Sequence, residues 1–487
     1  KTGVVIATSG PGATNLVTGI AIAYLDSVPL VAVTGNVSLD LLGRDSFQEV
    51  DIVGITQPVV KHSYILRDVR ELETVLRSAF EIAAAGRKGP VLIDIPKSVQ
   101  RDCCEYLGRE PVLPKPCFTV PDLREARQVI AGSKRPFIYC GGGVLASRAE
   151  TEVLALSERL GAPIGLSMMG LTAVPASYEL NLGMCGMHGH YGANQAQAQA
   201  DLIIAVGSRF SDRATGDIQE YTRNRQVIHI DVDEAELGKN VHSLIELCGD
   251  AKTILRQLLA ELPPGMNGMN GEWQKLALGY QQEDRQREDG EAFSPGNIIR
   301  AIAGQLPPET PVATDVGQHQ MWVMQHYGFE QPRTLLTSGG LGAMGFGLGA
   351  AIGGCIAAGR RRTVLFTGDG SFGMNLTELA TAVSQKLPLL IVLLNNGALG
   401  MVRQWQGMFY DGHYSATTLE RKTDFVKVAE AFGARGRRIR CLAELRAAFQ
   451  EGFPADGPLV LDCRISQDEK VFPMIPPGGS MKDIRLK

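Results

Sequence analysis

The sequence predicts an α/β protein made of three doubly wound domains, each built on a parallel β-sheet. Segments with strand and helix patterns alternate almost throughout the chain, as expected where helices cover both faces of parallel sheets. The 487 residues are too many for one hydrophobic core and suggest about three domains of roughly 150 residues each. A proline-rich passage at residues 110–121 and a polar one at 263–292 divide the chain accordingly.

The first predicted domain covers residues 1–108. It begins with an apolar strand that runs into the turn Ser-Gly-Pro-Gly at residues 9–12. Two further apolar runs of strand length follow, with segments of helical pattern beside them. The expected elements are the strands Val4–Thr8, Leu30–Thr34 and Pro90–Pro96 and the helices Ala13–Leu25 and Arg70–Ala85.

The second predicted domain covers residues 122–262 and the third covers residues 293–487. In both, short apolar runs alternate with helical patterns, which is typical of strands buried on both faces. The expected strands of the second domain are Phe137–Cys140, Pro163–Ser167, Leu202–Val206 and Val227–Ile230. Those of the third domain lie within residues 311–317, 363–370, 387–396 and 457–465.

The composition excludes several classes of protein. Hydrophobic residues make up 44% and charged residues 21%, with a formal net charge of −4, which is typical of a soluble globular protein and indicates no nucleic-acid partner. The nine cysteines include no C-x-x-C pair, so neither a disulfide framework nor a zinc site is expected. The uncharged stretch Thr334–Gly359 is long enough to span a bilayer, but its Gly and Ala content favours packing inside the protein, and we expect no membrane span.

The strongest chemical signal lies between Gly368 and Asn396. A strand, a helix expected to begin near Asn375 and a return strand would place Asp369 and Asn396 at the carboxyl ends of neighbouring parallel strands, where ligands of such sheets bind. Gly368 and its neighbours let the backbone approach a phosphate, and a helix N-terminus after Ser371 favours an anion. An Asp among phosphate-binding groups indicates a bridging cation, and oxygen ligands favour Mg²⁺.

This G-D-G sequence, followed at this spacing by Asn-Asn, resembles the thiamine-diphosphate motif. Other segments resemble the acetohydroxyacid synthase (acetolactate synthase) family, and the likeness covers essentially the whole chain. It implies a pyrimidine-binding, a central FAD-binding and a diphosphate-binding domain, in that order. It also implies that the side chains of Asp369 and Asn396 and the backbone carbonyl of Ala398 bind Mg²⁺, while Gly370 and Ser371 contact the diphosphate.

Three more segments resemble parts of the family's thiamine site. Residues 315–322 (DVGQHQMW) are similar to its diphosphate-anchoring turn, which implies contacts from Val316, Gly317, Gln318 and His319. Residues 338–353 are similar to the segment beneath the thiazolium ring, with Gly342 and with Met344 as the wedge that bends the cofactor. Residues 399–406 (LGMVRQWQ) are similar to the substrate loop, which implies that Met401 lines the donor pocket and contacts the cofactor.

The resemblance also assigns substrate contacts. Trp405 would pack against the ethyl group of 2-oxobutanoate, and one methylene at about 0.8 kcal/mol gives limited discrimination against pyruvate. Arg213 would grip the acceptor carboxylate through two parallel hydrogen bonds, although an exposed Arg in an ion pair is the commoner role. Gln48 would reach the active site of a neighbouring subunit, and Lys97 would lie at the entrance channel.

Glycines after a strand at Cys140–Gly143 and an Asp just past a later strand, Asp231, are weak signals of a dinucleotide site on their own. With their flanking segments they resemble the family's FAD-binding domain, where the flavin performs no net redox chemistry. The resemblance implies FAD contacts from Arg87, Gly141, Gly142, His188, Gly189, Arg209, Asp231 and Asp250.

By the same resemblance the protein is a carboligase (a transferase) of branched-chain amino acid biosynthesis, the route to valine, leucine and isoleucine. Pyruvate is decarboxylated on thiamine diphosphate, and the hydroxyethyl unit passes to pyruvate or 2-oxobutanoate. A cytoplasmic homodimer or homotetramer is expected, with a small regulatory subunit as a possible partner. The alternatives are another flavin-containing thiamine enzyme, such as a pyruvate oxidase or glyoxylate carboligase, and a catalytically dead paralogue.

One residue that the family needs has no counterpart in the sequence. The glutamate that protonates the aminopyrimidine lies upstream of the family segment that matches Lys1–Gly10. Residues 1–10 show no signal-peptide pattern and have the character of a strand without a lead-in. We therefore expect the chain to be N-terminally truncated, with the glutamate in the missing part.

Overall fold

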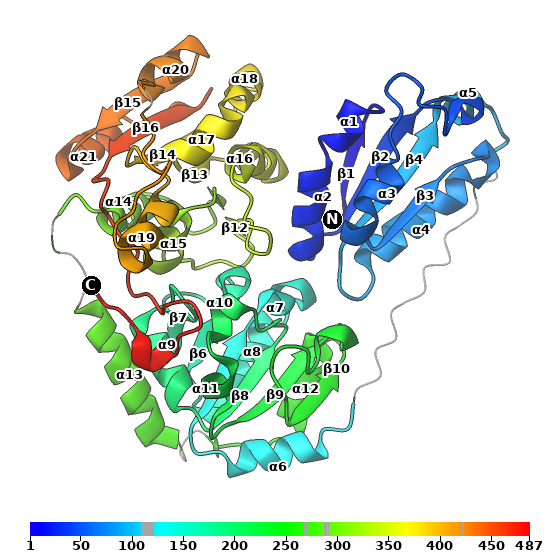
Figure 1. Cartoon of the computed structure of the whole chain (residues 1–487). Helices are drawn as coiled ribbons and strands as arrows, with labels where there is room; N and C mark the ends of the chain where they lie inside the picture. Colours follow the sequence, from blue (N-terminus) through cyan, green and yellow to red (C-terminus); the bar gives the residue numbers. More distant parts are fainter. Residues whose placement is uncertain (107, 109–120, 267–269, 287–289, 291, 421) are drawn as a thin grey trace. The chain divides into compact units, whose positions relative to one another are not determined.

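The computed structural model describes residues 1–106, 108, 121–266, 270–286, 290, 292–420 and 422–487 (Figure 1). The chain forms two compact units, one of Lys1–Phe118 with Ser338–Ala343 and one of Thr119–Thr337 with Met344–Lys487. Their described residues form three sheets of four, six and six strands, and every pair of named strands is parallel. The predicted fold class is confirmed. Among the described helices, none has the length and apolar character needed to cross a membrane.

The first unit is a four-stranded sheet in the order β1-β2-β4-β3. Helices α2 and α3 pack on one face through Ile20 and Ile52, and α4 packs on the other through Ala79 and Ala83. The predicted helix Ala13–Leu25 is divided into α1 and α2. The elements are β1 (Gly3–Ala7), β2 (Leu30–Asn36), β3 (His62–Ile65), β4 (Pro90–Pro96), α1 (Pro11–Thr14), α2 (Val17–Leu25), α3 (Ile52–Thr56), α4 (Leu72–Ala84) and α5 (Lys97–Arg101).

The second unit contains two six-stranded sheets, the first in the order β10-β9-β8-β5-β6-β7. Alternate residues of β5 face opposite ways: Ile138 packs with α8 and α12, and Tyr139 packs on the side of α9 and α13. The elements are β5 (Pro136–Cys140), β6 (Ile164–Leu166), β7 (Asn181–Met184), β8 (Leu202–Val206), β9 (Gln226–Asp231), β10 (Ile245–Cys248), α6 (Arg124–Gly132), α7 (Gly142–Ser147), α8 (Glu150–Leu160), α9 (Tyr191–Gln199), α10 (Asp212–Thr215), α11 (Ile218–Thr222), α12 (Ala251–Glu261) and α13 (Gly271–Arg285).

The other sheet of this unit has the order β12-β11-β13-β14-β16-β15. Helices α14, α15 and α21 pack on one face and α16, α17, α18 and α20 on the other. The elements are β11 (Val312–Thr314), β12 (Leu335–Leu336), β13 (Thr363–Gly368), β14 (Leu389–Asn395), β15 (Arg435–Ile439), β16 (Leu459–Arg464), α14 (Pro295–Ala303), α15 (Gln318–His326), α16 (Phe346–Ala357), α17 (Asp369–Asn375), α18 (Leu379–Ser384), α19 (Gly400–Phe409), α20 (Phe425–Ala431) and α21 (Leu442–Gln450).

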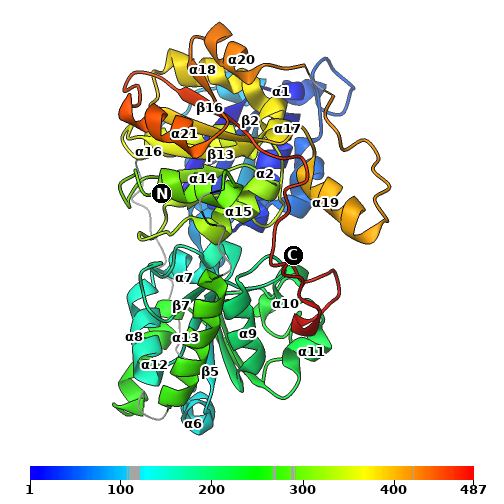
Figure 2. The same ribbon diagram turned by 90° about the vertical axis from the view of Figure 1, so that its left-hand side faces the viewer.

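The C-terminal segment ties the two sheets of the second unit together. Figure 2 shows it running from β16 to the helices of the central sheet. The backbone N–H of Ile475 donates to the carbonyl of Met187 at 2.8 Å, and that of Asp217 donates to Gly479 at 3.0 Å. Residues that follow strands of both sheets can therefore contribute to one site.

The histidine at the end of α15 makes stability depend on pH. Burial and the adjacent Arg300 guanidinium lower the pKa of His326 from 6.5 to about 3. The unfolded chain therefore binds one more proton than the folded chain between these values, so His326 destabilises the fold as pH falls below about 6.5. We expect the melting temperature of His326→Gln to fall less between pH 7.5 and 5 than that of the wild type. The same substitution at the exposed His413 is the control, and equal slopes in all three proteins would contradict the expectation.

Candidate cofactor and substrate site

Asp369 and Asn396 follow neighbouring strands at the same edge of their sheet. Strands β13 and β14 are parallel, and Gly368 pairs in register with Leu394. Asp369 is the next residue after β13, and Asn396 is the next after β14. This is the juxtaposition on which the predicted magnesium site depends.

The helix after β13 begins earlier than predicted. Instead of starting near Asn375, α17 spans Asp369–Asn375, so its first turn contains Gly370 and Ser371. Glycine disfavours helix by about 1 kcal/mol, and the sequence around it gave no helical signal. Packing overrides this preference, because Phe372 of the same turn is buried in the core. The free N–H groups of the first turn consequently lie directly beside Asp369, where they favour an anion.

The turn after β14 brings Asn396 to helix α15. Its side-chain oxygen accepts a hydrogen bond from the backbone N–H of Ala398 at 3.0 Å, and its amide nitrogen donates to Gln318 Oε1 at 3.2 Å. A Cβ built on Gly400 would lie 1.9 Å from that Gln318 oxygen. A side chain at position 400 would therefore displace the Gln318 amide from its hydrogen bond with Asn396.

His319 lies beside the end of β13 with a ring nitrogen available. A Cβ built on Gly368 would lie 2.9 Å from its Nδ1. The ring is buried, and its Nε2 has no hydrogen-bond partner among the residues that the structure describes. Burial lowers the pKa of His319 to about 3, so the ring is neutral at neutral pH. A phosphate oxygen at this position would satisfy the buried nitrogen.

These groups fit a magnesium-bound diphosphate. Asp369, Asn396 and the carbonyl of Ala398 offer only oxygen ligands, which Mg²⁺ prefers, and only one of them is charged. Within the described part of the chain, no group of three or more His, Cys, Asp or Glu side chains could hold a metal ion. A cation at Asp369 would therefore depend on oxygen atoms of its ligand, as a diphosphate supplies.

Two residues of this edge escaped the sequence interpretation. Asp315 follows β11, and its Oδ1 accepts from the backbone N–H groups of Val316 and Gly345 at 2.9 and 2.8 Å. Burial raises its pKa. An Asp after a strand is the signal that drew attention to Asp369, so it could have been found. Gln404 is buried and accepts from Gln318 Nε2 at 3.0 Å, but nothing in the sequence distinguishes it from other polar residues of a helix.

The predicted substrate residues that belong to the second unit lie at the sheet edge that carries Asp369 and Asn396. A Cβ built on Gly370 would lie 3.6 Å from Met344 Cε. Met401 and Trp405 belong to α19, which begins at Gly400. The Trp405 ring lies 5.4 Å from the guanidinium carbon of Arg213.

Arg213 and Trp405 are 192 positions apart in the chain, yet the structure brings these two predicted acceptor residues into contact. Arg213 also approaches the Asp212 carboxylate at 3.5 Å, and both side chains are more than half exposed. The ion pair that we gave as the commoner role for such an Arg is thus present, but it leaves the guanidinium accessible. A carboxylate could therefore bind it beside an aromatic wall.

The predicted FAD residues lie at the ends of four consecutive strands of the central sheet. Gly141, Arg209 and Asp250 come after β5, β8 and β10, and Asp231 is the last residue of β9; these strands lie in the order β5, β8, β9, β10 across the sheet. An extended ligand could run along this edge. Asp250, however, caps α12 by accepting from the backbone N–H of Thr253 at 3.0 Å, so a structural role already accounts for it.

The glycines and the histidine of the predicted FAD site are tightly packed. A Cβ on Gly141 would lie 1.9 Å from the Gly207 carbonyl oxygen, one on Gly142 would lie 3.2 Å from Met169 Cβ, and one on Gly189 would lie 2.5 Å from the Met184 carbonyl oxygen. His188 is buried, and its Nδ1 has no hydrogen-bond partner within the described residues. Burial and the nearby Arg213 lower its pKa to about 4. Such a nitrogen fits a polar ligand at this edge.

The remaining predicted site residues belong to the first unit. Lys97 begins α5 directly after β4 and lines a pocket at the carboxyl ends of β1, β2 and β4. Gln48 adopts a left-handed backbone conformation, with φ 60°. Arg87 Nε donates to Ser27 Oγ at 3.0 Å, and the backbone N–H of Gly342 donates to Ser338 Oγ at 3.1 Å.

Three domain families of thiamine pyrophosphate enzymes match the chain. They are the N-terminal TPP binding domain over residues 1–55, the central domain over 123–258 and the C-terminal TPP binding domain over 315–463. The acetolactate synthase isozyme 2 large subunit of Escherichia coli is 43% identical over 100% of this chain and 88% of that protein. The isozyme 1 large subunit of the same bacterium is 42% identical over 99% and 85%. The acetolactate synthase large subunit of Cyanidium caldarium is 41% identical over 99% and 84%. With similarity at this level over essentially its whole length, the chain belongs to the acetolactate synthase large-subunit family of thiamine pyrophosphate enzymes.

Proposed function

We propose that this protein is the catalytic subunit of an acetolactate synthase that uses thiamine diphosphate, Mg²⁺ and FAD. It decarboxylates pyruvate and transfers the two-carbon unit to pyruvate or 2-oxobutanoate, at the start of branched-chain amino acid biosynthesis. The observation that carries the proposal is the convergence of Asp369, Asn396, Gln318 and His319 at one sheet edge, in a chain whose full-length relatives are acetolactate synthases.

The residues at this edge would bind and orient the cofactor. When bound, thiamine diphosphate supplies the electron sink that makes decarboxylation of a 2-oxo acid possible. Asp369, Asn396 and the Ala398 carbonyl would hold Mg²⁺, and the first-turn N–H groups of α17 would bind diphosphate oxygens. Because His319 is neutral, one ring nitrogen carries a proton that it can donate to a phosphate.

The acceptor would lie between Arg213 and Trp405. The guanidinium would bind its carboxylate through paired charge-assisted hydrogen bonds, and the indole ring would pack against its alkyl group. Both groups are positioned before the substrate arrives, because they already contact each other. The carboxylate that every 2-oxo acid shares would thus be recognised separately from the alkyl group that distinguishes one acceptor from another.

The central sheet would bind FAD along the strand ends that carry Gly141, Arg209 and Asp231, in a structural role. The relatives are named large subunits, which supports a small regulatory subunit as a partner. We propose a homodimer or homotetramer and a cytoplasmic location.

The product of the reaction distinguishes an acetolactate synthase from the alternative thiamine enzymes. With pyruvate, thiamine diphosphate, Mg²⁺ and FAD, we expect acetolactate, measured as acetoin after acid decarboxylation, and 2-aceto-2-hydroxybutanoate when 2-oxobutanoate is added. With phosphate added, acetyl phosphate formed with consumption of oxygen and release of hydrogen peroxide would indicate a pyruvate oxidase. With glyoxylate in place of pyruvate, tartronate semialdehyde would indicate a carboligase of that substrate. A gene whose sequence upstream of Lys1 encodes no glutamate for the aminopyrimidine would favour the inactive paralogue.

A further inference from the structure

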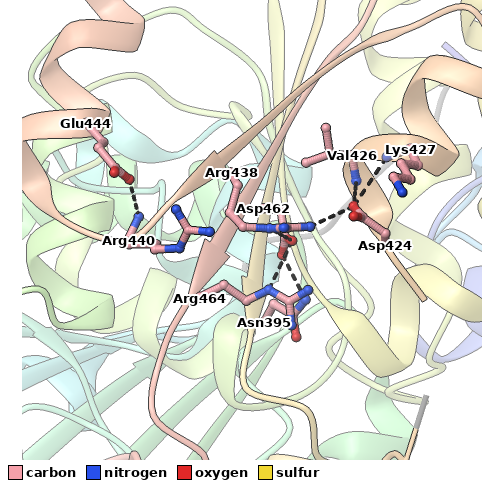
Figure 3. Close-up of polar contacts among 9 residues, drawn as sticks. All are labelled: Asn395, Asp424, Val426, Lys427, Arg438, Arg440, Glu444, Asp462 and Arg464. Carbon is pink, nitrogen blue, oxygen red and sulfur yellow. Dashed lines mark hydrogen bonds and ion pairs between the residues drawn. The ribbon is translucent and has the colours of Figure 1, made fainter. Parts of the chain in front are cut away.

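The buried carboxylate of Asp462 lies beside the turn Asn396–Ala398, which is proposed to bind Mg²⁺, but Asp462 is not part of that turn. Asp462 of β16 is fully buried, and Figure 3 shows it between Asn395, Arg438 and Arg464. Its Oδ1 accepts from Asn395 Nδ2 at 2.8 Å, and its Oδ2 accepts from Arg438 Nε at 3.3 Å and Arg464 Nε at 3.1 Å. Each oxygen therefore has its own set of partners, and only Oδ1 faces β14.

Stability alone does not explain the polar pair that Asp462 forms with Asn395. The other residues of β14 are all Leu, Ile or Val, and apolar side chains would fill this part of the sheet as well as a buried charge, often better. Asn395 is the last residue of β14, at the point where the chain leaves the sheet. Its backbone carbonyl also accepts from the N–H of Ile465 at 3.1 Å. Both its main chain and its side chain are thus attached to β16.

The residues after Asn395 are those proposed to bind Mg²⁺. Asn396 is its immediate neighbour, and Gly397 follows with φ 66°. Within this turn, the N–H of Ala398 donates to Asn396 Oδ1. Any rotation of the Asn395 peptide would move the ligand oxygens of Asn396 and Ala398 together, because the turn is internally bonded.

We infer that Asn395 and Asp462 are positioning residues whose hydrogen bond fixes the end of β14, so that Asn396 and Ala398 present their oxygens to Mg²⁺. This inference rests on the proposed function, since it concerns the same metal site. Neither residue is among the proposed Mg²⁺ ligands. Groups that hold a metal ligand in place typically change metal affinity about 10- to 100-fold when removed.

The other partners of Asp462 provide the controls. Arg464 binds only Oδ2 and is partly exposed. Arg438 also pairs with Asp424 at 2.7 Å, and Asp424 caps α20 through the N–H groups of Val426 and Lys427 (Figure 3). Arg464 pairs in register with Asn395, but its side chain bonds Oδ2 of Asp462 and not Oδ1. Arg464→Gln therefore disturbs the same network while it leaves the Asn395–Asp462 hydrogen bond in place, and it is the matched control.

The test is a Mg²⁺ titration of thiamine-diphosphate binding to the full chain, followed by calorimetry, with melting temperatures recorded without ligand. We expect Asn395→Ala to weaken the apparent Mg²⁺ affinity by about 10-fold or more, and Arg464→Gln to leave it unchanged. Asp462→Asn keeps an oxygen that can accept from Asn395 and should retain the affinity, whereas Asp462→Leu should lose it. If Asn395→Ala does not fold, the comparison of Asp462→Asn with Asp462→Leu tests the inference.

Two results would overturn the inference: wild-type Mg²⁺ affinity in Asn395→Ala or in Asp462→Leu, or equal losses in Asn395→Ala and Arg464→Gln that follow the loss of melting temperature. The second result would mean that the network only stabilises the sheet. A wild-type chain that binds thiamine diphosphate without any dependence on Mg²⁺ would instead contradict the proposed function. The two failures are thereby distinguishable.

Discussion

Asp369→Asn is expected to weaken Mg²⁺-dependent binding of thiamine diphosphate by at least about 100-fold, more than the loss of groups that merely support metal ligands. Asp369 is the one charged member of the proposed ligand set, and Mg²⁺ binds neutral amide oxygens less well than carboxylates. Calorimetric titration with the cofactor at fixed Mg²⁺ measures the effect, and acetolactate formation should fall with it. Glu378→Gln is the control, because Glu378 lies on the same segment but is exposed.

Thermal unfolding separates loss of the site from loss of the fold. Asp369 is only 4% exposed, so its substitution can change the stability of the fold as well as the site. The melting temperatures of Asp369→Asn and the wild type without ligands are therefore the baseline for each protein. With Mg²⁺ and thiamine diphosphate, the wild type should gain melting temperature through binding, and the variant should gain little. A variant that gains as much as the wild type would show that Asp369 is not a metal ligand.

The strands that the sequence did not reveal share one property: all five lie at the edge of a sheet. They are β3, β7, β10, β12 and β15. An interior strand of a parallel sheet is buried on both faces, so it appears as a continuous apolar run such as Leu389–Asn395. An edge strand has one neighbour and keeps polar residues, as β15 does with the sequence RGRRI. Apolar runs therefore predicted the sheet interiors and the edge strand β1, but not the other edge strands.

The contacts of the candidate site likewise include some that the sequence could predict and others that it could not. The Asp369–Asn396 juxtaposition was predictable because one strand–helix–strand unit contains both residues and parallel crossovers have a fixed geometry. The contact of Arg213 with Trp405 depends on how two sheets pack in one unit, which no local pattern encodes, and only the family resemblance anticipated a shared role. The bonds of Asp462 to Asn395 and Arg438 join three strands. An Asp inside an apolar strand shows that a partner is needed without showing which one.

Arg213 and Trp405 should have separable effects on the acceptor. Arg213→Gln removes the only group proposed to bind the acceptor carboxylate, and hydrogen bonds to charged groups are worth about 1.5–3 kcal/mol, so kcat/KM for either acceptor should fall about 10- to 100-fold. Pyruvate and 2-oxobutanoate carry the same carboxylate. The ratio of 2-aceto-2-hydroxybutanoate to acetolactate formed from a mixture of the two should therefore stay constant in this variant.

Trp405→Leu should instead change the ratio of 2-aceto-2-hydroxybutanoate to acetolactate. In the proposed site the indole ring packs against the alkyl group of the acceptor and not against its carboxylate, and one methylene at about 0.8 kcal/mol corresponds to about a 4-fold change in that product ratio. Arg485→Lys is the matched control. Arg485 lies 5.0 Å from the ring of Phe409, which belongs to the same helix as Trp405, and it has no proposed contact with substrate. A changed ratio in Arg213→Gln, or an unchanged one in Trp405→Leu, would mean that the two side chains do not divide recognition of the acceptor between its carboxylate and its alkyl group.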